Sequence, residues 1–169
     1  MKKLIFAAVA LFVFNLSNAQ EGALTVGAHL GLPMADVQDS HSLNAGIDAA
    51  YMWSVDDKFS AGIAVGYTTF SGKKSTVDLG PLGSITQENP AISFIPVAAS
   101  AQYLLTDSVF AGLDLGYAIG ASDNNDGGLY YQPKVGYNAE AFQVFVGYKG
   151  ISLEDATAAS VNLGFIYKM

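Results

Sequence analysis

Hydrophobic residues alternate with small or polar residues along most of the chain. Between Leu24 and Leu32 every second residue is apolar, and residues such as Gly27 and His29 occupy the positions between them. Successive side chains of a β-strand point to opposite faces, so a period of two is typical of a strand with two unlike faces. No window after residue 19 shows the three-to-four residue apolar spacing of a helix. The pattern therefore predicts a β-protein.

Seven further segments repeat this alternation. They cover residues 44–53, 59–67, 95–103, 109–117, 129–137, 142–148 and 161–169. A tilted strand of about nine to eleven residues crosses the hydrocarbon core of a membrane, and the smallest bacterial membrane barrels have eight strands. We therefore predict an all-β fold, an eight-stranded antiparallel transmembrane β-barrel connected as an up-and-down meander.

The connections between these segments alternate in length. Residues 54–58, 105–108 and 138–141 form short connections, whereas residues 33–41, 71–90, 121–127 and 150–158 form longer ones. Outer-membrane barrels have short periplasmic turns and longer outward loops. With both termini in the periplasm, the four longer connections are expected outside the cell.

The distribution of glycine indicates which face of each strand lines the interior. Eleven strand glycines share one face with the charged and amide residues, and the opposite face carries mainly Leu, Val, Ile, Ala and aromatic residues. A narrow eight-stranded interior must mix small and large side chains. The second face would cause aggregation if water covered it. We interpret the first face as the lumen and the second as the lipid-facing surface.

Five charged residues on the lumenal face form a predicted lumenal polar cluster. Its members are Asp48, Asp114, Lys134, Lys149 and Lys168. An eight-stranded interior is just wide enough to be filled by its own side chains, so we interpret the cluster as a packed ion-pair plug; a selectivity filter and a proton relay are the alternatives. Pairing Ile119 with Leu129 across the third outer loop predicts that Asp114 lies directly opposite Lys134, close enough for an ion pair.

Aromatic residues gather near the ends of the predicted strands, as in the interfacial girdles of membrane barrels. The predicted periplasmic girdle contains Tyr51, Trp53, Phe59, Tyr103, Tyr137, Phe142 and Tyr167. The predicted outer girdle contains Tyr67, Tyr117, Tyr131 and Tyr148. Pro96 and Pro133 lie inside predicted strands, and proline donates no ladder hydrogen bond, so we expect a bulge or a missing ladder bond at each.

The first nineteen residues have the features of a secretory signal peptide. Lys2 and Lys3 precede an apolar run of eleven residues, and small residues follow at Ser17 and Ala19. The run is too short for a transmembrane helix, which needs about twenty residues. We expect cleavage after Ala19, which leaves one barrel domain over residues 20–169 and changes the formal charge from −7 to −9 by removing two lysines.

The composition agrees with export to a membrane and excludes several classes of function. Hydrophobic residues make up 51% of the 169 residues and charged residues only 14%. The chain has no cysteine, which excludes disulfide bonds and cysteine-bound metals. It has no arginine and only eight lysines, so binding to a nucleic-acid backbone is not expected. We predict no cofactor and no metal.

Several loose motifs, in their order along the chain, resemble the small outer-membrane β-barrel domain family, which includes porin-like and OmpX-like barrels of Gram-negative bacteria. They lie at residues 94–97, 102–103, 112–120, 133–137 and 163–169. The resemblance implies contact with outer-membrane lipid, and with the barrel-insertion machinery and periplasmic chaperones during biogenesis. Members of the family usually end on an aromatic residue. This chain ends on Met169, so the implied insertion signal depends more on Phe165 and Tyr167.

Two short motifs suggest chemistry, and each has a simpler interpretation. Ser40, His41 and Ser42 follow Asp39 on an outward loop, but neighbouring residues of a strand point to opposite faces, so we expect no hydrogen-bonded relay there without loop distortion. Residues 123–128 resemble a calcium loop but lack its bidentate Glu, so a tight polar turn is preferred, with weak binding of divalent cations as the alternative.

Taken together, the sequence predicts a non-enzymatic outer-membrane barrel that presents four surface loops, for interaction at the cell surface or for envelope structure. A narrow porin or transporter of ions or of a small apolar molecule is the alternative. A lipid A-modifying enzyme is the third possibility. A polar, filled lumen favours the first of these, because it leaves no continuous path for a solute.

Overall fold

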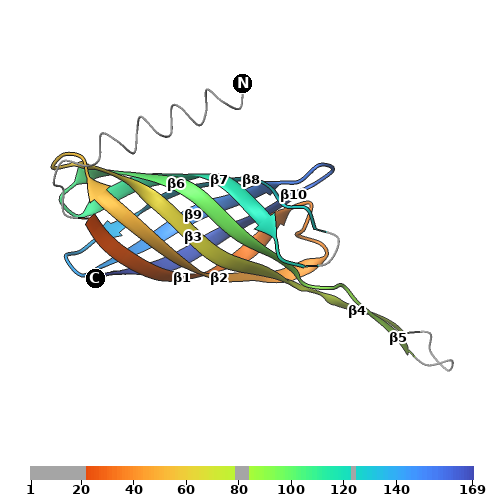
Figure 1. Ribbon diagram of the computed structural model, residues 1–169. Helices are drawn as coiled ribbons and strands as arrows, with labels where there is room; N and C mark the ends of the chain where they lie inside the picture. The colour runs from red at the N-terminus through yellow and green to blue at the C-terminus, as the bar shows by residue number, and fades with distance from the viewer. Residues whose placement is uncertain (1–21, 79–83, 123–124) are drawn as a thin grey trace, which may run out of the picture.

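The computed structural model describes residues 22–78, 84–122 and 125–169, and its main body is a closed β-barrel (Figure 1). Eight strands form it in the order β1, β10, β9, β8, β7, β6, β3, β2, each antiparallel to its neighbours. They are β1 (Gly22–Ala35), β2 (His41–Ser54), β3 (Phe59–Gly72), β6 (Ile92–Thr106), β7 (Val109–Gly120), β8 (Gly128–Asn138), β9 (Phe142–Ser152) and β10 (Thr157–Lys168). The predicted eight-stranded meander is confirmed.

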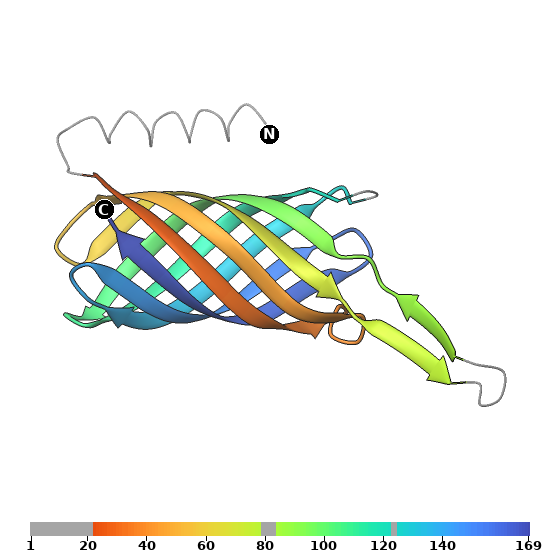
Figure 2. The same ribbon diagram turned by 90° about the horizontal axis from the view of Figure 1, so that it is seen from below.

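Two additional strands were not predicted. The segment expected as the longest loop forms a hairpin of β4 (Lys74–Asp78) and β5 (Ser84–Glu88), which pair only with each other. The hairpin continues the directions of β3 and β6 and projects well beyond the barrel rim (Figures 1 and 2). It escapes detection by alternation because each strand has only five residues.

The barrel has two unlike ends. One, here called the turn end, carries the turns 55–58, 107–108 and 139–141 and the C-terminus; the other, the loop end, carries the connections 36–40, 121–127 and 153–156 and the β4–β5 hairpin. The expected loop 150–158 is shorter than predicted because β9 and β10 continue into it. Only three of the four connections at the loop end are therefore longer than every turn.

The outward face of the barrel is apolar on every strand. Leu32, Ile47 and Leu163 are 67%, 64% and 61% exposed, and large hydrophobic side chains of the other five strands are exposed in the same way. A continuous belt of this kind is stable against lipid and not against water. No helix in the described residues is long and apolar enough to span a membrane. The strands are the spanning elements, and the fold is a transmembrane β-barrel.

Both in-strand prolines interrupt one ladder, as expected. The pairing of β3 with β6 has a gap at residues 66 and 67, beside Pro96, and the pairing of β8 with β9 has a gap at residues 132 and 133. The register is the same on both sides of each gap, so the interruptions are missing ladder contacts and not bulges. The cause is the absent N–H of proline.

The predicted register between β7 and β8 is wrong by two residues. Asp114 lies opposite Gln132, and Lys134 lies opposite Gly112. The prediction assumed that Ile119 pairs with Leu129, but the last pair is Ala118 with Gly128, and Ile119 and Gly120 pair only with β6, so the connecting loop starts and ends one residue earlier than assumed. A shift of two residues preserves the face of each side chain, and Asp114 and Lys134 therefore still meet in the lumen.

The aromatic residues of the two predicted girdles lie on the outward face, each at least partly exposed. Two pairs of girdle residues are in contact, Tyr51 with Trp53 at a ring-centroid distance of 5.0 Å and Tyr131 with Tyr148 at 6.2 Å. The girdle residue Phe142 also contacts Phe165, at 5.6 Å. Their role as interfacial anchors, and the role of Phe165, Tyr167 and Met169 in insertion, stay predictions. The expected signal peptide lies outside the described residues.

Candidate functional site: the barrel interior

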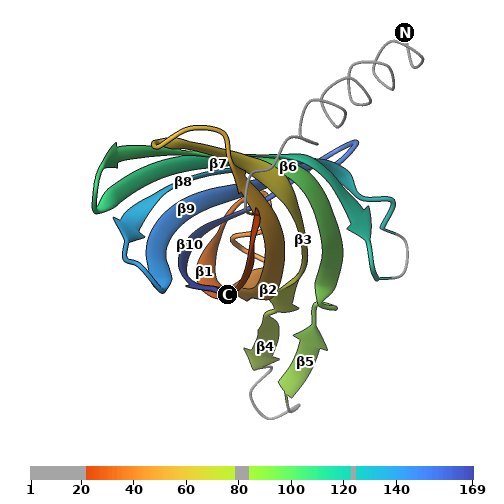
Figure 3. The same ribbon diagram turned by 60° about the vertical axis from the view of Figure 1, so that its left-hand side comes forward.

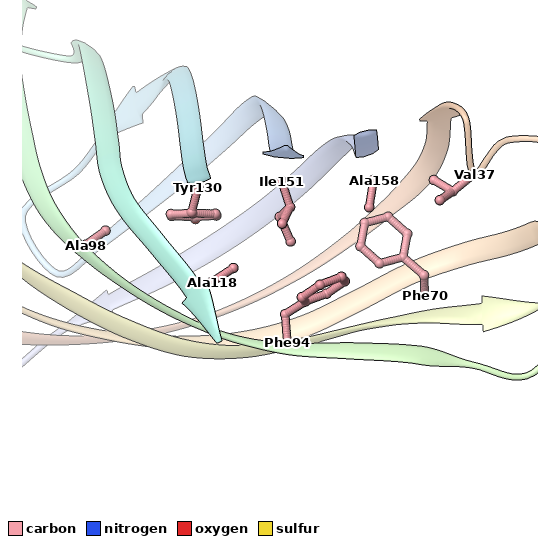
Figure 4. Close-up of a cluster of buried hydrophobic side chains, with 8 residues drawn as sticks. All are labelled: Val37, Phe70, Phe94, Ala98, Ala118, Tyr130, Ile151 and Ala158. Atoms are coloured by element: carbon pink, nitrogen blue, oxygen red, sulfur yellow. The ribbon is translucent and has the colours of Figure 1, made fainter. Parts of the chain in front are cut away.

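The loop half of the lumen is closed by an apolar cluster. Phe70 and Phe94 are fully buried, with ring centroids 6.3 Å apart in an edge-to-face arrangement. They pack with Ile151, Tyr130 and smaller residues, which gather in the interior (Figure 4). The prediction of a lumen blocked by polar side chains is thus incomplete. Phe70, Phe94, Ile151 and Tyr130 lie on the same face of their strands as the lumenal glycines and polar residues, so the alternation in the sequence could have predicted their inward orientation.

On the turn side of this cluster, three ionisable side chains from three strands form a chain of hydrogen bonds. Lys149 Nζ lies 2.7 Å from His29 Nε2, and His29 Nδ1 lies 2.7 Å from Asp48 Oδ2. A lysine ammonium only donates, so Nε2 accepts from it and Nδ1 carries the proton that is donated to the carboxylate. His29 therefore links a fully buried lysine to its counter-charge. His29 lay on the predicted lumenal face but was not assigned to the cluster.

Neutral side chains extend this network around the wall of the lumen. Thr68 Oγ1 lies 3.3 Å from His29 Nε2 and accepts from Asn44 Nδ2 at 2.8 Å. Ser160 Oγ donates to Asn44 Oδ1 at 3.1 Å and accepts from Asn162 Nδ2 at 3.1 Å. Residues from β1, β2, β3, β9 and β10 are thereby cross-linked in the interior. Polar groups removed from water need such partners, so this network stabilises one arrangement of the strands.

A second ionic group lies closer to the turn end. Lys134 Nζ donates to both carboxylate oxygens of Asp114, at 2.7 and 3.0 Å, and both side chains are about nine-tenths buried. Ser100 Oγ also donates to Asp114, at 2.5 Å, and the Lys134 ammonium lies 5.7 Å from the ring centroid of Phe145. The carboxylate is held from two strands, which explains why the predicted contact forms despite the different register.

The turn half of the lumen contains a cavity of about 260 Å³. Exposed residues of the turn 55–58 lie at its mouth, and Ser100 and Lys134 lie deeper in the barrel. A smaller space of about 40 Å³ continues from there toward Asp48 and Asp114. The barrel is therefore open at the turn end and closed at the loop end. Figure 3, which is turned toward the turn end, shows the strands curving around this interior.

The structure separates the five predicted lumenal residues into three places. Asp48 and Lys149 belong to the network around His29, and Asp114 pairs with Lys134. Lys168 stands alone near the turn end, where its Nζ donates to Asn138 Oδ1 and to the carbonyl oxygen of Ala139. The interior is thus two polar clusters and one separate cation, and not a single plug.

The loop motif at Ser40 and His41 differs from its prediction. Ser40 Oγ lies 2.8 Å from His41 Nδ1, a contact that the strand geometry was expected to prevent. It forms because Ser40 belongs to the turn that precedes β2 and not to the strand itself. His41 Nε2 is buried without a hydrogen-bond partner among the described residues, so none of their carboxylates orients the ring. The pair therefore lacks the third member of a catalytic relay.

Metal sites are not indicated in the part of the chain that the structure describes, where no group of three or more His, Asp or Glu residues is placed to hold an ion. The calcium-like motif that begins at Asp123 lies partly outside the described residues. Asn125 within it has a structural role, because its Oδ1 accepts from the backbone N–H of Gly127, which has a φ of 81°. A glycine is favoured at that turn position for this reason.

Comparison with known proteins identifies the fold. No family model matches the chain, and no curated protein matches it. The crystal structure of Ail, the attachment invasion locus protein of Yersinia pestis, has a TM-score of 0.55 and 15% identity, covering 89% of this chain and 99% of that one. The structure of Ail in a phospholipid nanodisc has a TM-score of 0.51 and 16% identity, covering 88% of this chain and 100% of that one.

A designed transmembrane β-barrel is also similar, with a TM-score of 0.52 and 12% identity over 89% of this chain and 100% of the design. At these identities the likeness concerns the fold. It agrees with the resemblance expected from the motifs, and the apolar belt supplies the physical reason for a location in lipid. The chain has the fold of the small, eight-stranded outer-membrane β-barrels.

Proposed function

We propose that this barrel is a non-enzymatic anchor that holds the β4–β5 hairpin away from the outer membrane for contact with a partner at the cell surface. The observation that carries the proposal is the projection of this hairpin beyond the rim, on the same side as the three loops of the loop end (Figure 2). Strands that leave the barrel serve no role in closing it. A projecting pair of strands offers backbone groups to another molecule.

The interior supports an anchor over a transporter. Phe70, Phe94 and Ile151 are fully buried at the loop end, so a solute that entered from the turn end would meet packed side chains there. No carboxylate of the described residues is hydrogen-bonded to His41, which supports a non-enzymatic role over lipid modification. The proposed partners during biogenesis are the insertion machinery and periplasmic chaperones.

The test is removal of the hairpin. Replacing residues 75–87 by two glycines shortens the connection between β3 and β6 without changing any barrel strand. The variant should therefore insert into the membrane, and boiling should change its gel mobility as it changes that of the unmodified protein. We expect intact cells that carry it to lose their adhesion to sister cells or to cultured host cells. Lys58→Gln, at the opposite end, is the matched control and should adhere normally. Adhesion that survives the deletion at the level of the control contradicts the proposal.

A further inference from the structure

The cavity at the turn end has the features of a binding site. It is about 260 Å³ in volume, slightly below the roughly 300 to 1,000 Å³ typical of ligand pockets, so it suits a small ligand. It is open at one end only, because the apolar cluster around Phe70 and Phe94 closes the other half of the barrel. A blind cavity of this shape binds a molecule and does not conduct it.

One of the partly buried charged side chains that line the cavity has no partner of opposite charge among the described residues. The charged residues that line it are Asp56, Asp57, Lys58, Lys134 and Lys168. Lys134 is neutralised by Asp114, and Asp56 Oδ1 already accepts from the backbone N–H groups of Lys58 and Phe59, both at 2.7 Å. Asp56, Asp57 and Lys58 are exposed at the mouth, where water screens them. Lys168, half-buried at the end of β10, is the cation that remains to be matched.

The ammonium of Lys168 is held by neutral acceptors alone. Nζ donates to Asn138 Oδ1 at 2.6 Å and to the Ala139 carbonyl at 2.7 Å, which uses two of its three hydrogens. No carboxylate among the described residues forms an ion pair with it. Asn138 Oδ1 also accepts from Gln143 Nε2 at 2.9 Å, and Gln143 and Gln102 bond to each other through their amides. The Asn138 side chain and the Ala139 carbonyl therefore position the ammonium of Lys168, and its third N–H has no acceptor among the described residues.

Apolar side chains line other parts of the same cavity. Ala23, Met52, Leu104 and Ile166 contribute to it, each from the inward face of its strand. A ligand that fills the cavity thus meets one cationic donor, several amides and hydroxyls, and aliphatic carbon. This combination matches a small amphiphilic anion, whose charged group takes the free donor while its short chain covers the aliphatic side chains.

We propose that the turn-end cavity binds a small organic monocarboxylate with a short aliphatic chain, and that Lys168 is its charge partner. The carboxylate accepts the third hydrogen of Lys168 Nζ, and the chain lies against Met52, Leu104 and Ile166. This site is independent of the surface function proposed above, because it lies at the opposite end of the barrel and uses none of the hairpin residues.

The test uses hexanoate as the probe and the methyl group of Met52 as the reporter. The full mature protein, labelled with ¹³C at its methionine methyls, is placed in phosphatidylcholine nanodiscs and titrated by NMR. Met34, at the loop end, and Met169, which is 63% exposed, report non-specific effects of the probe on the lipid. We expect a saturable shift of the Met52 signal alone, and a much weaker effect of hexanol, which has the same chain without the charge.

Two variants and one control separate a site from general charge effects. Lys168→Gln removes the charge but keeps a donor, and should weaken hexanoate binding roughly tenfold, the effect of one charge-assisted hydrogen bond. Ala50→Leu changes no charge, reduces the cavity space and should also weaken binding, so it provides a second test if Lys168→Gln impairs insertion. Lys73→Gln, an exposed charge at the opposite end of the barrel, should bind as the unmodified protein does.

Three outcomes overturn the proposal. They are a Met52 signal that does not saturate, equal binding of hexanol and hexanoate, and equal weakening by Lys73→Gln and Lys168→Gln. None of them bears on the adhesion test, because the hairpin is present throughout.

Discussion

The two halves of the barrel interior solve the same packing problem in different ways. In the loop half, large apolar side chains such as Phe70 and Phe94 meet the network of His29 and Lys149, and the space is filled. In the turn half, Phe110 is fully buried, yet an open cavity of about 260 Å³ remains. Barrel closure therefore does not require a filled lumen along its whole length. The backbone ladders close the barrel, and the side chains determine which end is sealed.

This difference separates the two proposed activities. The sealed half provides a rigid base for the hairpin that projects from it, because a base that opened would move the hairpin with it. The open half leaves room for a small ligand. The four predictions that follow compare the two ends, in order of decreasing effect.

The largest difference is expected in protease access to the two ends. Lys73 and Lys74 are exposed at the base of the hairpin, and Lys58 is exposed in a turn at the opposite end. If the loop end faces outward, trypsin added to intact cells should cut at Lys73 or Lys74 and leave the bond after Lys58 intact. Mass spectrometry of the fragments is the measurement. Cutting at Lys58 with the other two sites protected would reverse the assignment of the ends.

Unfolding free energies should distinguish the packed half from the open half. Phe94→Ala removes a fully buried ring from a closed cluster and should cost about 3 to 5 kcal/mol. Leu104→Ala, beside the cavity, removes contacts from one side only and should cost about 1 kcal/mol, since the side chain is only partly buried. Urea unfolding in lipid vesicles measures both. Equal costs would mean that the cavity is packed in the protein in lipid.

The comparison also shows what the alternation in the sequence determines. A period of two and the position of the glycines were sufficient for the eight barrel strands and their inward faces, and the two in-strand prolines, Pro96 and Pro133, for the interruptions beside them. The register between β7 and β8 was not, because it depends on where the connecting loop starts and ends, and Ile119 and Gly120 pair only with β6. Alternation specifies a face, whereas the position of the loop specifies a partner.

Contacts between distant strands were equally beyond the pattern. His29 contacts Asp48 on the neighbouring strand β2, 19 residues away, and Lys149 on β9, 120 residues away, and the second contact depends on closure of the barrel. The apolar residues of the loop half could have been predicted, because Phe70 and Phe94 share the face of the lumenal polar residues. The hairpin was missed because two strands of five residues give too short a pattern.

Breaking the ion pair between Asp114 and Lys134, where the two halves meet, should lower the free energy of unfolding by a smaller amount, and the effects of substituting the two residues should be coupled. Asp114→Asn and Lys134→Met each leave a charged partner largely buried, and each should cost about 3 kcal/mol, the lower end for buried pairs, because the cavity admits water. The double variant should recover most of the loss. A double-mutant cycle on urea unfolding measures the coupling, and strictly additive costs would show that the contact contributes nothing.

The smallest effect is expected in conductance, where the unmodified protein should give no stable channel in a planar bilayer. The reason is that the open half leads to a closed half: the space beyond Lys134 narrows to about 40 Å³, and fully buried Phe70, Phe94 and Ile151 lie at the loop end. Lys134→Ala widens the lumen between the two halves but should add no conductance, since the apolar cluster on the loop side of Lys134 still closes the barrel. Reproducible current steps in the unmodified protein that disappear in Asp114→Ala or Lys134→Ala would instead place a conducting path through the ion pair. That result would favour the transport alternative over a closed anchor and would require the apolar cluster to open in the membrane.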